Sequence, residues 1–297
     1  MSAPPTLGPA DEQPVVMGIV NATPDSFSDG GRYRGLEALV ARGYALHEAG
    51  AKIIDVGGES GVTHRAAVAA EEEARRVVPV VERLAAAGMA VSVDTWKAPV
   101  ARAALTAGAV MVNDVSGLRD PAMAEVCARA GAHLVITHTR AAPKRKEFPI
   151  YADVVADVVA FLRERVAAAV AAGVERERIV VDPGLDLAKT PAQSVEVLRR
   201  LGELRALERP ILLAASRKDF VGALTGRAPR ARLAGTLAAV ACGVGAGAAM
   251  LRVHDVPEVV DFLTVRAALD GSRRVPAKLR LEETLRREPD GQAPPVG

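Results

Sequence analysis

The sequence predicts one (β/α)8 barrel, the TIM-barrel class of α/β fold, and three observations support it. A short apolar run rich in Val and Ile, a polar or glycine-rich break and an alanine-rich amphipathic segment recur eight times in 297 residues. The apolar runs are nearly continuous, as in parallel strands that helices cover. No Gly-x-Gly-x-x-Gly motif follows the first run, which ranks a doubly wound open sheet with a dinucleotide site lower.

The elements follow one another in order along the chain. The eight apolar runs are expected to be strands at 15–20, 52–58, 90–95, 110–115, 133–139, 179–184, 210–216 and 249–255. The expected helices lie at 36–49, 69–87, 97–107, 121–130, 152–172, 191–207, 231–247 and 256–269. Residues 1–14 are expected to form a disordered extension, 15–270 the single barrel, and 271–297 a short helix and disordered tail.

Composition excludes several classes of partner. The formal net charge is +2 and acids and bases are interleaved, which argues against a nucleic-acid surface. The longest apolar stretch, 234–251, is diluted with Gly and Ala and ends at Arg252, so no membrane span is expected. Residues 1–14 lack the pattern of a signal peptide. Cys127 and Cys242 lie in alanine-rich helical sequence and read as core residues in a reducing compartment, which predicts a cytoplasmic protein.

Polar residues gather where the predicted strands end, and in such a barrel the chemistry sits at the carboxyl ends of the strands. These residues are Asn21, Asp55, Glu59, Asp94, Asn113, Asp114, His138, Asp182, Ser216, Arg217, Lys218, Arg252 and His254. Any one of them can be structural. Asp55 lies inside its strand, where it would satisfy a neighbour in the barrel, and His138 would suit a packed, hydrogen-bonded position. Their conjunction on all eight strands predicts one shared site.

The residues at this mouth are of two kinds. Asp94, Asn113 and Asp182 offer acceptors to the ring N–H and amino groups of a flat heterocycle such as a pterin or purine. Arg217, Lys218, Arg252 and His254 are donors and expected cations, which suit a phosphate or carboxylate. The implied ligands are a polar ring and an anion side by side.

Several motifs resemble those of the dihydropteroate synthase family, in the same order and spacing. They are MGIVNATPDSFSDGG, IIDVGGES, VSVDTWK, VNDVSG, VDPG followed by KT, SRK and RVHDV, and the resemblance covers about 15–270. It implies a transferase of folate biosynthesis that joins 6-hydroxymethyl-7,8-dihydropterin diphosphate to p-aminobenzoate, giving 7,8-dihydropteroate and diphosphate. It further implies Mg²⁺, small-molecule substrates and a homodimer formed through the last helices.

The resemblance also assigns roles by position. It implies that the pterin is bound by Asp94, Asn113, Asp182 and Lys218, with Arg217 nearby. It implies that Asn21 binds Mg²⁺ and diphosphate, and that Arg252 and His254 bind the diphosphate. The catalytic residues that it implies are Asp94, Lys218, Arg252 and His254. Loops 22–33 and 59–68 would be mobile and close over the site. Departure of diphosphate would leave a cation that the pterin ring delocalises, and the neutral aromatic amine would need positioning more than a base.

Three segments depart from the family pattern, all on the p-aminobenzoate side. ESGVTHRA stands for ESTRPG, DPGLDLAK for DPGxGFGK and SRKD for SRKS, so Thr63, Arg65, Leu187 and Asp219 are the candidate residues there. A carboxylate at Asp219 would repel the substrate carboxylate if it faced the pocket.

The basic loop at 137–149, with Arg140, Lys144, Arg145 and Lys146, would supply a compensating cation or be a solvated surface loop. Two alternative functions stay open. One is a diverged paralogue that uses another amine or only binds pterin. The other is a pterin-dependent methyltransferase. The RVHDV and SRK motifs argue against it, because a methyl donor has no diphosphate for them to bind.

Overall fold

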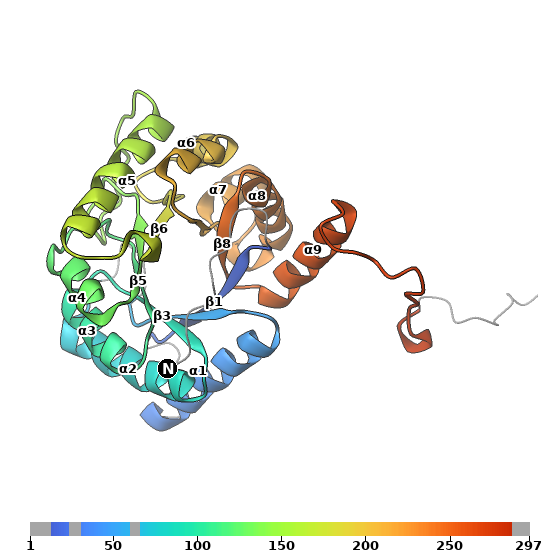
Figure 1. Ribbon diagram of the computed structural model, residues 1–297, viewed down its shortest axis with the longest axis horizontal. Helices are drawn as coiled ribbons and strands as arrows, with labels where there is room; N and C mark the ends of the chain where they lie inside the picture. Colours follow the sequence, from blue (N-terminus) through green and yellow to red (C-terminus); the bar gives the residue numbers. More distant parts are fainter. Residues whose placement is uncertain (1–12, 24–30, 60–65, 287–297) are drawn as a thin grey trace, which may run out of the picture. The chain divides into compact units, whose positions relative to one another are not determined.

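The computed structural model describes residues 13–23, 31–59 and 66–286, and within them parallel strands close into a barrel. Each strand pairs with its sequence neighbours, and β8 pairs with β1. Figure 1 shows the strands in the centre, with helices outside them. The strands are β1 (Val15–Asn21), β2 (Ile53–Gly57), β3 (Ala90–Asp94), β4 (Met111–Asp114), β5 (His133–Thr137), β6 (Ile179–Asp182), β7 (Ile211–Leu213) and β8 (Ala248–Val253). The predicted (β/α)8 barrel is confirmed.

The helices follow the strands in the expected alternation. They are α1 (Gly31–Glu48), α2 (Ala70–Ala86), α3 (Ala98–Thr106), α4 (Ala122–Ala130), α5 (Val154–Ala171), α6 (Pro191–Arg199), α7 (Asp219–Thr225), α8 (Leu233–Gly245) and α9 (Val256–Leu269). The predicted helix 191–207 continues beyond Arg200 as the 3-10 helix η3 (Leu201–Leu207). Helix α7 was not predicted, because seven residues are too few to carry a helical hydrophobic period.

The chain divides into two compact units, of which the first ends at Val260 and the second begins at Asp261, inside α9. The second unit also contains the 3-10 turn η5 (Glu283–Leu285). Residues 1–12 and 287–297 lie outside the described residues, and the predicted boundaries after residues 14 and 270 stay a prediction. Among the helices that are described, none combines the length and the apolar character needed to cross a bilayer.

The barrel interior is built in layers, because alternate residues of each strand face inward. One layer is an apolar core that takes one residue from every strand: Met17, Ile53, Ala90, Met111, Val135, Val180, Leu212 and Met250. Two residues further along the chain come Ile19, Asp55, Ser92, Asn113, Thr137, Asp182, Ala214 and Arg252, of which Ala214 lies just after the end of β7. The same period that closes the base of the barrel therefore places a largely polar layer directly above it.

The two cysteines differ in environment. Cys127 on α4 is buried as expected, whereas Cys242 on α8 is exposed, so the prediction that both are core residues is wrong for Cys242. Helix α8 is apolar or small on nearly all sides, so its sequence does not reveal which side faces the barrel.

Candidate active site

The polar layer of the barrel contains buried groups that lack a partner in the described part of the chain. They are Oδ1 of Asp55, Oγ of Ser92, Oδ1 of Asn113 and Oγ1 of Thr137. These residues lie on β2, β3, β4 and β5 and are at most 1% exposed. Because buried polar atoms nearly always have a hydrogen-bond partner, this group indicates a site for a ligand rich in donors.

Arg252 on β8 lies between two carboxylates. Its Nε is 2.6 Å from Oδ2 of Asp55 and its Nη2 is 2.6 Å from Oδ2 of Asp94. Asp55 Oδ2 also accepts a hydrogen bond of 3.2 Å from Nδ2 of Asn113. Burial lowers the pKa of the Arg252 guanidinium, but Asp55 and Asp94 raise it more, so the net shift is upward. Asp55 thus satisfies its neighbours inside the barrel, as the sequence suggested.

Asp94 and Asp182 are the two carboxylates that the sequence assigns to a ring. Burial raises the pKa of Asp94 to about 7, although the charge of Arg252 opposes this. Burial also raises the pKa of Asp182, against the Gly184 N–H and the charge of Lys218. The Gly184 N–H donates to Oδ1 of Asp182 at 2.7 Å. The charge of Lys218 acts on both carboxylates, which places these three predicted residues in one electrostatic site.

His254 is neutral, contrary to the expectation of a cation. Burial, then the charges of Arg217 and Arg252, lowers its pKa to about 4. Its backbone N–H donates to Oγ of Ser216 at 3.2 Å, and that oxygen lies 3.0 Å from Nδ1 of the ring. A Ser hydroxyl can both donate and accept, and its donation to Nδ1 would leave the ring proton on Nε2. His254 is consequently an uncharged imidazole at this mouth, with one ring N–H and one ring acceptor.

Arg217 is held by an ion pair. Its Nε is 3.0 Å from Oδ2 of Asp255, and Nη2 contacts the second oxygen of the same carboxylate. Its backbone has a φ of 59°, in the left-handed region, and its N–H donates to Oγ1 of Thr236 at 3.1 Å. The bidentate pair turns the guanidinium toward Asp255, so its predicted place beside a ring is untested.

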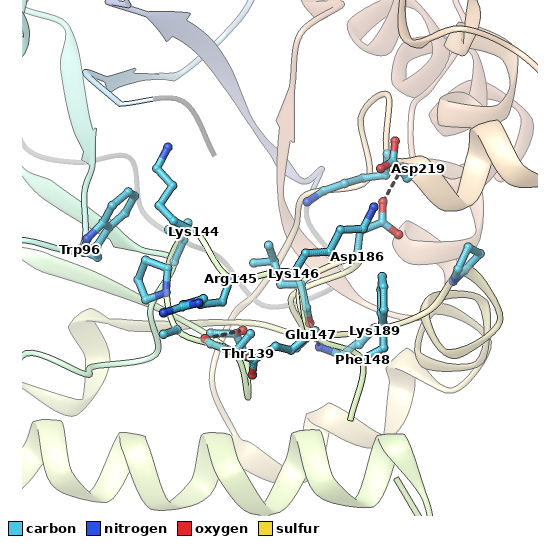
Figure 2. A pocket seen from close by; sticks show the side chains of 18 of the residues that line it. Trp96, Thr139, Lys144, Arg145, Lys146, Glu147, Phe148, Asp186, Lys189 and Asp219 are labelled. Atoms are coloured by element: carbon cyan, nitrogen blue, oxygen red, sulfur yellow. Dashed lines mark hydrogen bonds between the residues drawn. The ribbon is translucent and has the colours of Figure 1, made fainter. Parts of the chain in front are cut away.

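A cavity of about 670 Å³ lies over the ends of β3 to β7 (Figure 2). Its lining includes Trp96, Thr139, the loop 141–148, the loop 186–189 and the segment 217–219. Of the predicted p-aminobenzoate residues, Leu187 and Asp219 line it. Thr63 and Arg65 lie outside the described residues, as do 24–30 of the first predicted closing loop. Asn21 ends β1 and is exposed.

The carboxylate of Asp219 is neutralised by a neighbour. Its Oδ1 is 2.9 Å from Nη1 of Arg232, and its side chain is 81% exposed. Asp186, from the loop after β6, accepts hydrogen bonds from the backbone N–H groups of Asp219 and Phe220 at the start of α7. Both carboxylates at the altered positions therefore have structural partners, which removes much of the repulsion expected of Asp219.

The backbone is in the left-handed region at two positions where the dihydropteroate synthase motif DPGxGFGK has glycine. Asp186 has a φ of 64° and Ala188 a φ of 52°. A side chain in the left-handed region costs about 1–2 kcal/mol, less for Asp, whose side chain can bond locally. Both residues therefore adopt a backbone conformation that glycine would adopt without this cost.

The basic loop at 137–149 contains cations that form ion pairs and cations that are exposed at the surface. Arg140 donates to both oxygens of Asp157, at 2.9 and 2.7 Å. Lys144 is 3.2 Å from Oε1 of Glu59. Arg145 and Lys146 are exposed and line the cavity. Arg140 is thus committed to Asp157, and the choice between a compensating cation and a solvated loop remains for Arg145 and Lys146.

A second buried ion cluster was missed by sequence reasoning. Nζ of Lys97 is 2.6 Å from Oε2 of Glu59, from Oε2 of Glu73 and from the carbonyl oxygen of Val68. The side chains of Glu59 and Glu73 are 2% and 0% exposed. Glu59, a strand-end candidate, is therefore engaged in holding α2 and the start of α3 together. Glu73 lies in a run of three acids in the first turn of α2, which gave no signal that one is buried.

The predicted metal ligand, Asn21, suits a metal ion that takes few protein ligands. Among the residues described, no three His, Cys, Asp or Glu side chains are grouped to hold a metal ion. Asn21 offers a single amide oxygen. This suits Mg²⁺, which usually keeps several waters and takes few protein ligands beside substrate phosphates.

Comparison with known proteins agrees with these observations. A family model described as pterin binding enzyme matches residues 17–254. The probable bifunctional folylpolyglutamate synthase/dihydropteroate synthase of Haloferax volcanii is 42% identical over 93% of this chain, which spans only 33% of that relative. The dihydropteroate synthase of Mycobacterium leprae is 48% identical over 85% of this chain and 92% of its own. A structure of Xanthomonas albilineans dihydropteroate synthase with 4-aminobenzoic acid superposes with a TM-score of 0.83 at 46% identity, covering 90% of this chain and 95% of that one.

Proposed function

The chain belongs to the pterin binding enzymes and, among them, to the dihydropteroate synthases, and from this premise we propose its reaction. It joins 6-hydroxymethyl-7,8-dihydropterin diphosphate to p-aminobenzoate and releases 7,8-dihydropteroate and diphosphate. The C–O bond to diphosphate breaks, the C–N bond to the amine forms, and the amine loses one proton. The observation that carries this proposal is the layer of unpartnered buried acceptors beside Asp94, Asp182 and Lys218.

The ring is held by acceptors inside the barrel. Asp94, Asn113 and Asp182 accept from ring N–H and amino groups, and Lys218 supplies a nearby positive charge. Ionised Asp94 stabilises the positive charge that develops on the pterin as diphosphate leaves. Burial that raises the pKa of Asp94 to about 7 also means that this carboxyl is only partly ionised at neutral pH before substrate binds.

The leaving group meets donors at the ends of β7 and β8. When the Ser216 hydroxyl donates to Nδ1 of His254, the ring proton lies on Nε2, and the neutral imidazole donates it in a hydrogen bond to the anion. The guanidinium of Arg252 donates to Asp55 and Asp94 in this structure. In the proposed complex its N–H groups donate both to those carboxylates and to the diphosphate.

Mg²⁺ is the proposed metal, with the amide oxygen of Asn21 and the diphosphate oxygens as its ligands. When bound it supplies charge neutralisation for the departing diphosphate. This chain's own part is to present Asn21 at the end of β1.

The amine enters the cavity lined by Leu187, Lys218 and Asp219. Positioning is its main need, since an aromatic amine is neutral at pH 7 and nucleophilic without a base. Arg232 neutralises Asp219, which permits an acidic amine such as p-aminobenzoate to approach.

Diphosphate release from the purified protein, with pterin diphosphate and Mg²⁺, tests the proposal. Release is expected only when p-aminobenzoate is also present, with one diphosphate per dihydropteroate. Binding of the pterin without turnover would favour the diverged paralogue. Release with another amine in place of p-aminobenzoate would correct the second substrate.

We also propose a homodimer and a cytoplasmic location. An exposed line of small residues on α8, Ala234, Ala238 and Cys242, supports close contact with a second copy. Both cysteines are free thiols, which fits a reducing compartment. Sedimentation of the purified protein tests the dimer, and a mass corresponding to one chain across micromolar concentrations would contradict it.

A further inference from the structure

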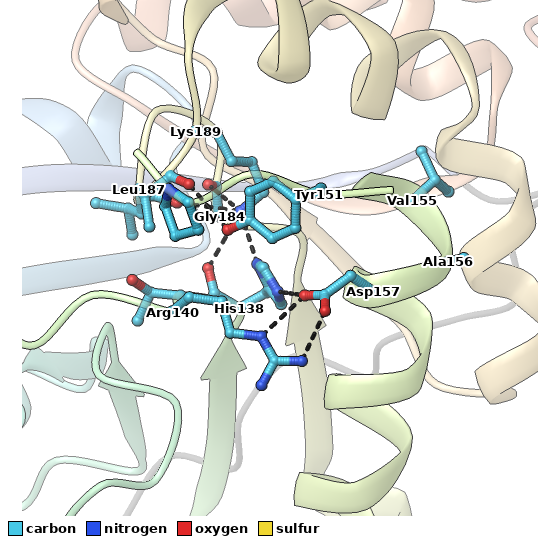
Figure 3. A network of polar contacts seen from close by, with 12 residues as sticks. His138, Arg140, Tyr151, Val155, Ala156, Asp157, Gly184, Leu187 and Lys189 are labelled. Atoms are coloured by element: carbon cyan, nitrogen blue, oxygen red, sulfur yellow. Dashed lines mark hydrogen bonds and ion pairs between the residues drawn. The ribbon is translucent and has the colours of Figure 1, made fainter. Parts of the chain in front are cut away.

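Lys189, which ends the loop after β6, is a fully buried lysine, with 1% of its surface exposed. Its Nζ lies 2.7 Å from Nδ1 of His138, 2.9 Å from the carbonyl oxygen of Gly184 and 3.1 Å from that of Leu187. Figure 3 shows these contacts converging on the amino group of Lys189. Burial lowers the pKa of Lys189 to about 7, against the charge of Asp182, so the amino group is partly charged near neutral pH. Its N–H groups donate to these buried acceptors, which satisfies them inside the protein.

The partners of His138 define the direction of its hydrogen bonds. Nε2 is 2.9 Å from Oδ1 of Asp157, whose two oxygens also accept from Arg140. An ionised carboxylate only accepts, so Nε2 carries the ring proton and Nδ1 accepts from Lys189. Burial, then the charge of Lys189, lowers the pKa of His138 to about 3, which keeps the ring neutral. Arg140, Asp157, His138 and Lys189 therefore form one directed chain from α5 to the loop after β6.

The loop that Lys189 holds is the one that holds Asp182. Gly184 accepts from Lys189 through its carbonyl and donates through its N–H to Oδ1 of Asp182 at 2.7 Å. Its φ is 65°, and a Cβ there would lie 2.0 Å from the carbonyl oxygen of His138. The loop consequently rests directly on the backbone of the β5–α5 connection, where small displacements are resisted by close contact.

We propose that Lys189 is a positioning residue for the pterin ring: its buried amino group donates to the Gly184 carbonyl and fixes Gly184, whose N–H orients the carboxylate of Asp182. The inference rests on the proposed function, because it takes Asp182 as a ring ligand. Lys189 also acts directly on that carboxylate, since its positive charge lowers the pKa of Asp182 against the effect of burial. If Lys189 were purely structural, its replacement would lower the stability of the protein but would not change pterin affinity through Asp182.

The test compares Lys189→Met and the milder Lys189→Gln by calorimetric titration with 6-hydroxymethylpterin, which carries no phosphate. The expected result is a 10- to 100-fold rise in Kd for Lys189→Met and a smaller rise for Lys189→Gln. In an Asp182→Asn background, Lys189→Gln should change Kd by less than twofold, because the two residues act on one contact.

Tyr151→Phe is the matched control. The Tyr151 hydroxyl donates to the carbonyl oxygen of Ala188 at 2.9 Å, in the same loop but away from Gly184. Its Kd should stay within twofold of the wild type, although its melting temperature falls.

Three results would overturn the inference: an unchanged Kd in folded Lys189→Gln, additive effects of Lys189→Gln and Asp182→Asn, or an equal loss of affinity in Tyr151→Phe. Failure of the wild-type protein to bind the pterin would instead contradict the proposed function, so the two failures are distinguishable.

Discussion

Replacement of Arg252 by Met tests the charge balance inside the barrel. The guanidinium lies 2.6 Å from Asp55, whose side chain is 0% exposed, and 2.6 Å from Asp94, whose side chain is 20% exposed. Met has similar length but no charge, so the variant leaves two carboxylates close together without their cation. Removing one partner of a buried ion pair typically costs about 3–5 kcal/mol, so we expect a loss of that size in the free energy of unfolding at pH 8.

The loss should depend on pH in a defined direction. The folded-state pKa of Asp94 is about 7, above its unfolded value, and the charge of Arg252 holds it down. Without Arg252 this pKa rises further. Because a raised acid pKa makes stability fall as pH rises from the unfolded value through the folded one, the variant should be penalised more at pH 8 than at pH 5.5.

Urea unfolding at both pH values, followed by circular dichroism, measures this effect. Arg83→Met is a matched control, since Arg83 pairs with Glu37 at the surface, where such pairs contribute about 0.2–1 kcal/mol. A deficit in Arg252→Met below about 1 kcal/mol, or one that is larger at pH 5.5 than at pH 8, would refute the reasoning.

Three further predictions concern the site and its loops. Ala188→Gly should stabilise the protein by about 0.5–1 kcal/mol, because Ala188 has a φ of 52°, whereas Ala103→Gly inside α3 should destabilise it by about as much; thermal melts of both decide. Affinity for a phosphate-free pterin should fall toward tenfold per pH unit just below pH 7 in the wild type, as Asp94 protonates, and Asp94→Asn should bind weakly and lose the fall near pH 7, while protonation of Asp182 still weakens binding at lower pH. Asp219→Ser should change the KM for p-aminobenzoate by less than about threefold, because Arg232 already neutralises the exposed carboxylate; a tenfold fall in KM would show that Asp219 does repel the substrate.

The sequence carried most of the fold because the strands repeat one pattern. Near-continuous apolar runs and the polar residues at their ends were enough to predict the barrel and to place Asp94, Asn113 and Asp182 at one mouth. Short elements such as α7 were not predicted, because seven residues are too few to show a helical period of hydrophobic residues.

The partners of the site residues could not be predicted. That Arg252 binds Asp55 and Asp94, and that Lys97 binds Glu59 and Glu73, depends on which side chains meet across strands. The neutral state of His254 depends on burial and on the charges of Arg217 and Arg252, neither of which is written in its local sequence. The sequence showed Lys189 only as one position of a motif. Its role was inferred from the carbonyl oxygens that surround it in the structure.

The central claim is that acceptors inside the barrel hold the ring while donors at the ends of β7 and β8 hold the diphosphate. Calorimetric titration of His254→Ala and Asp182→Asn with 6-hydroxymethylpterin and with its diphosphate tests this most directly. The account predicts that His254→Ala loses at least tenfold affinity for the diphosphate alone, whereas Asp182→Asn loses affinity for both ligands by the same factor. Equal losses for both ligands in His254→Ala would contradict it.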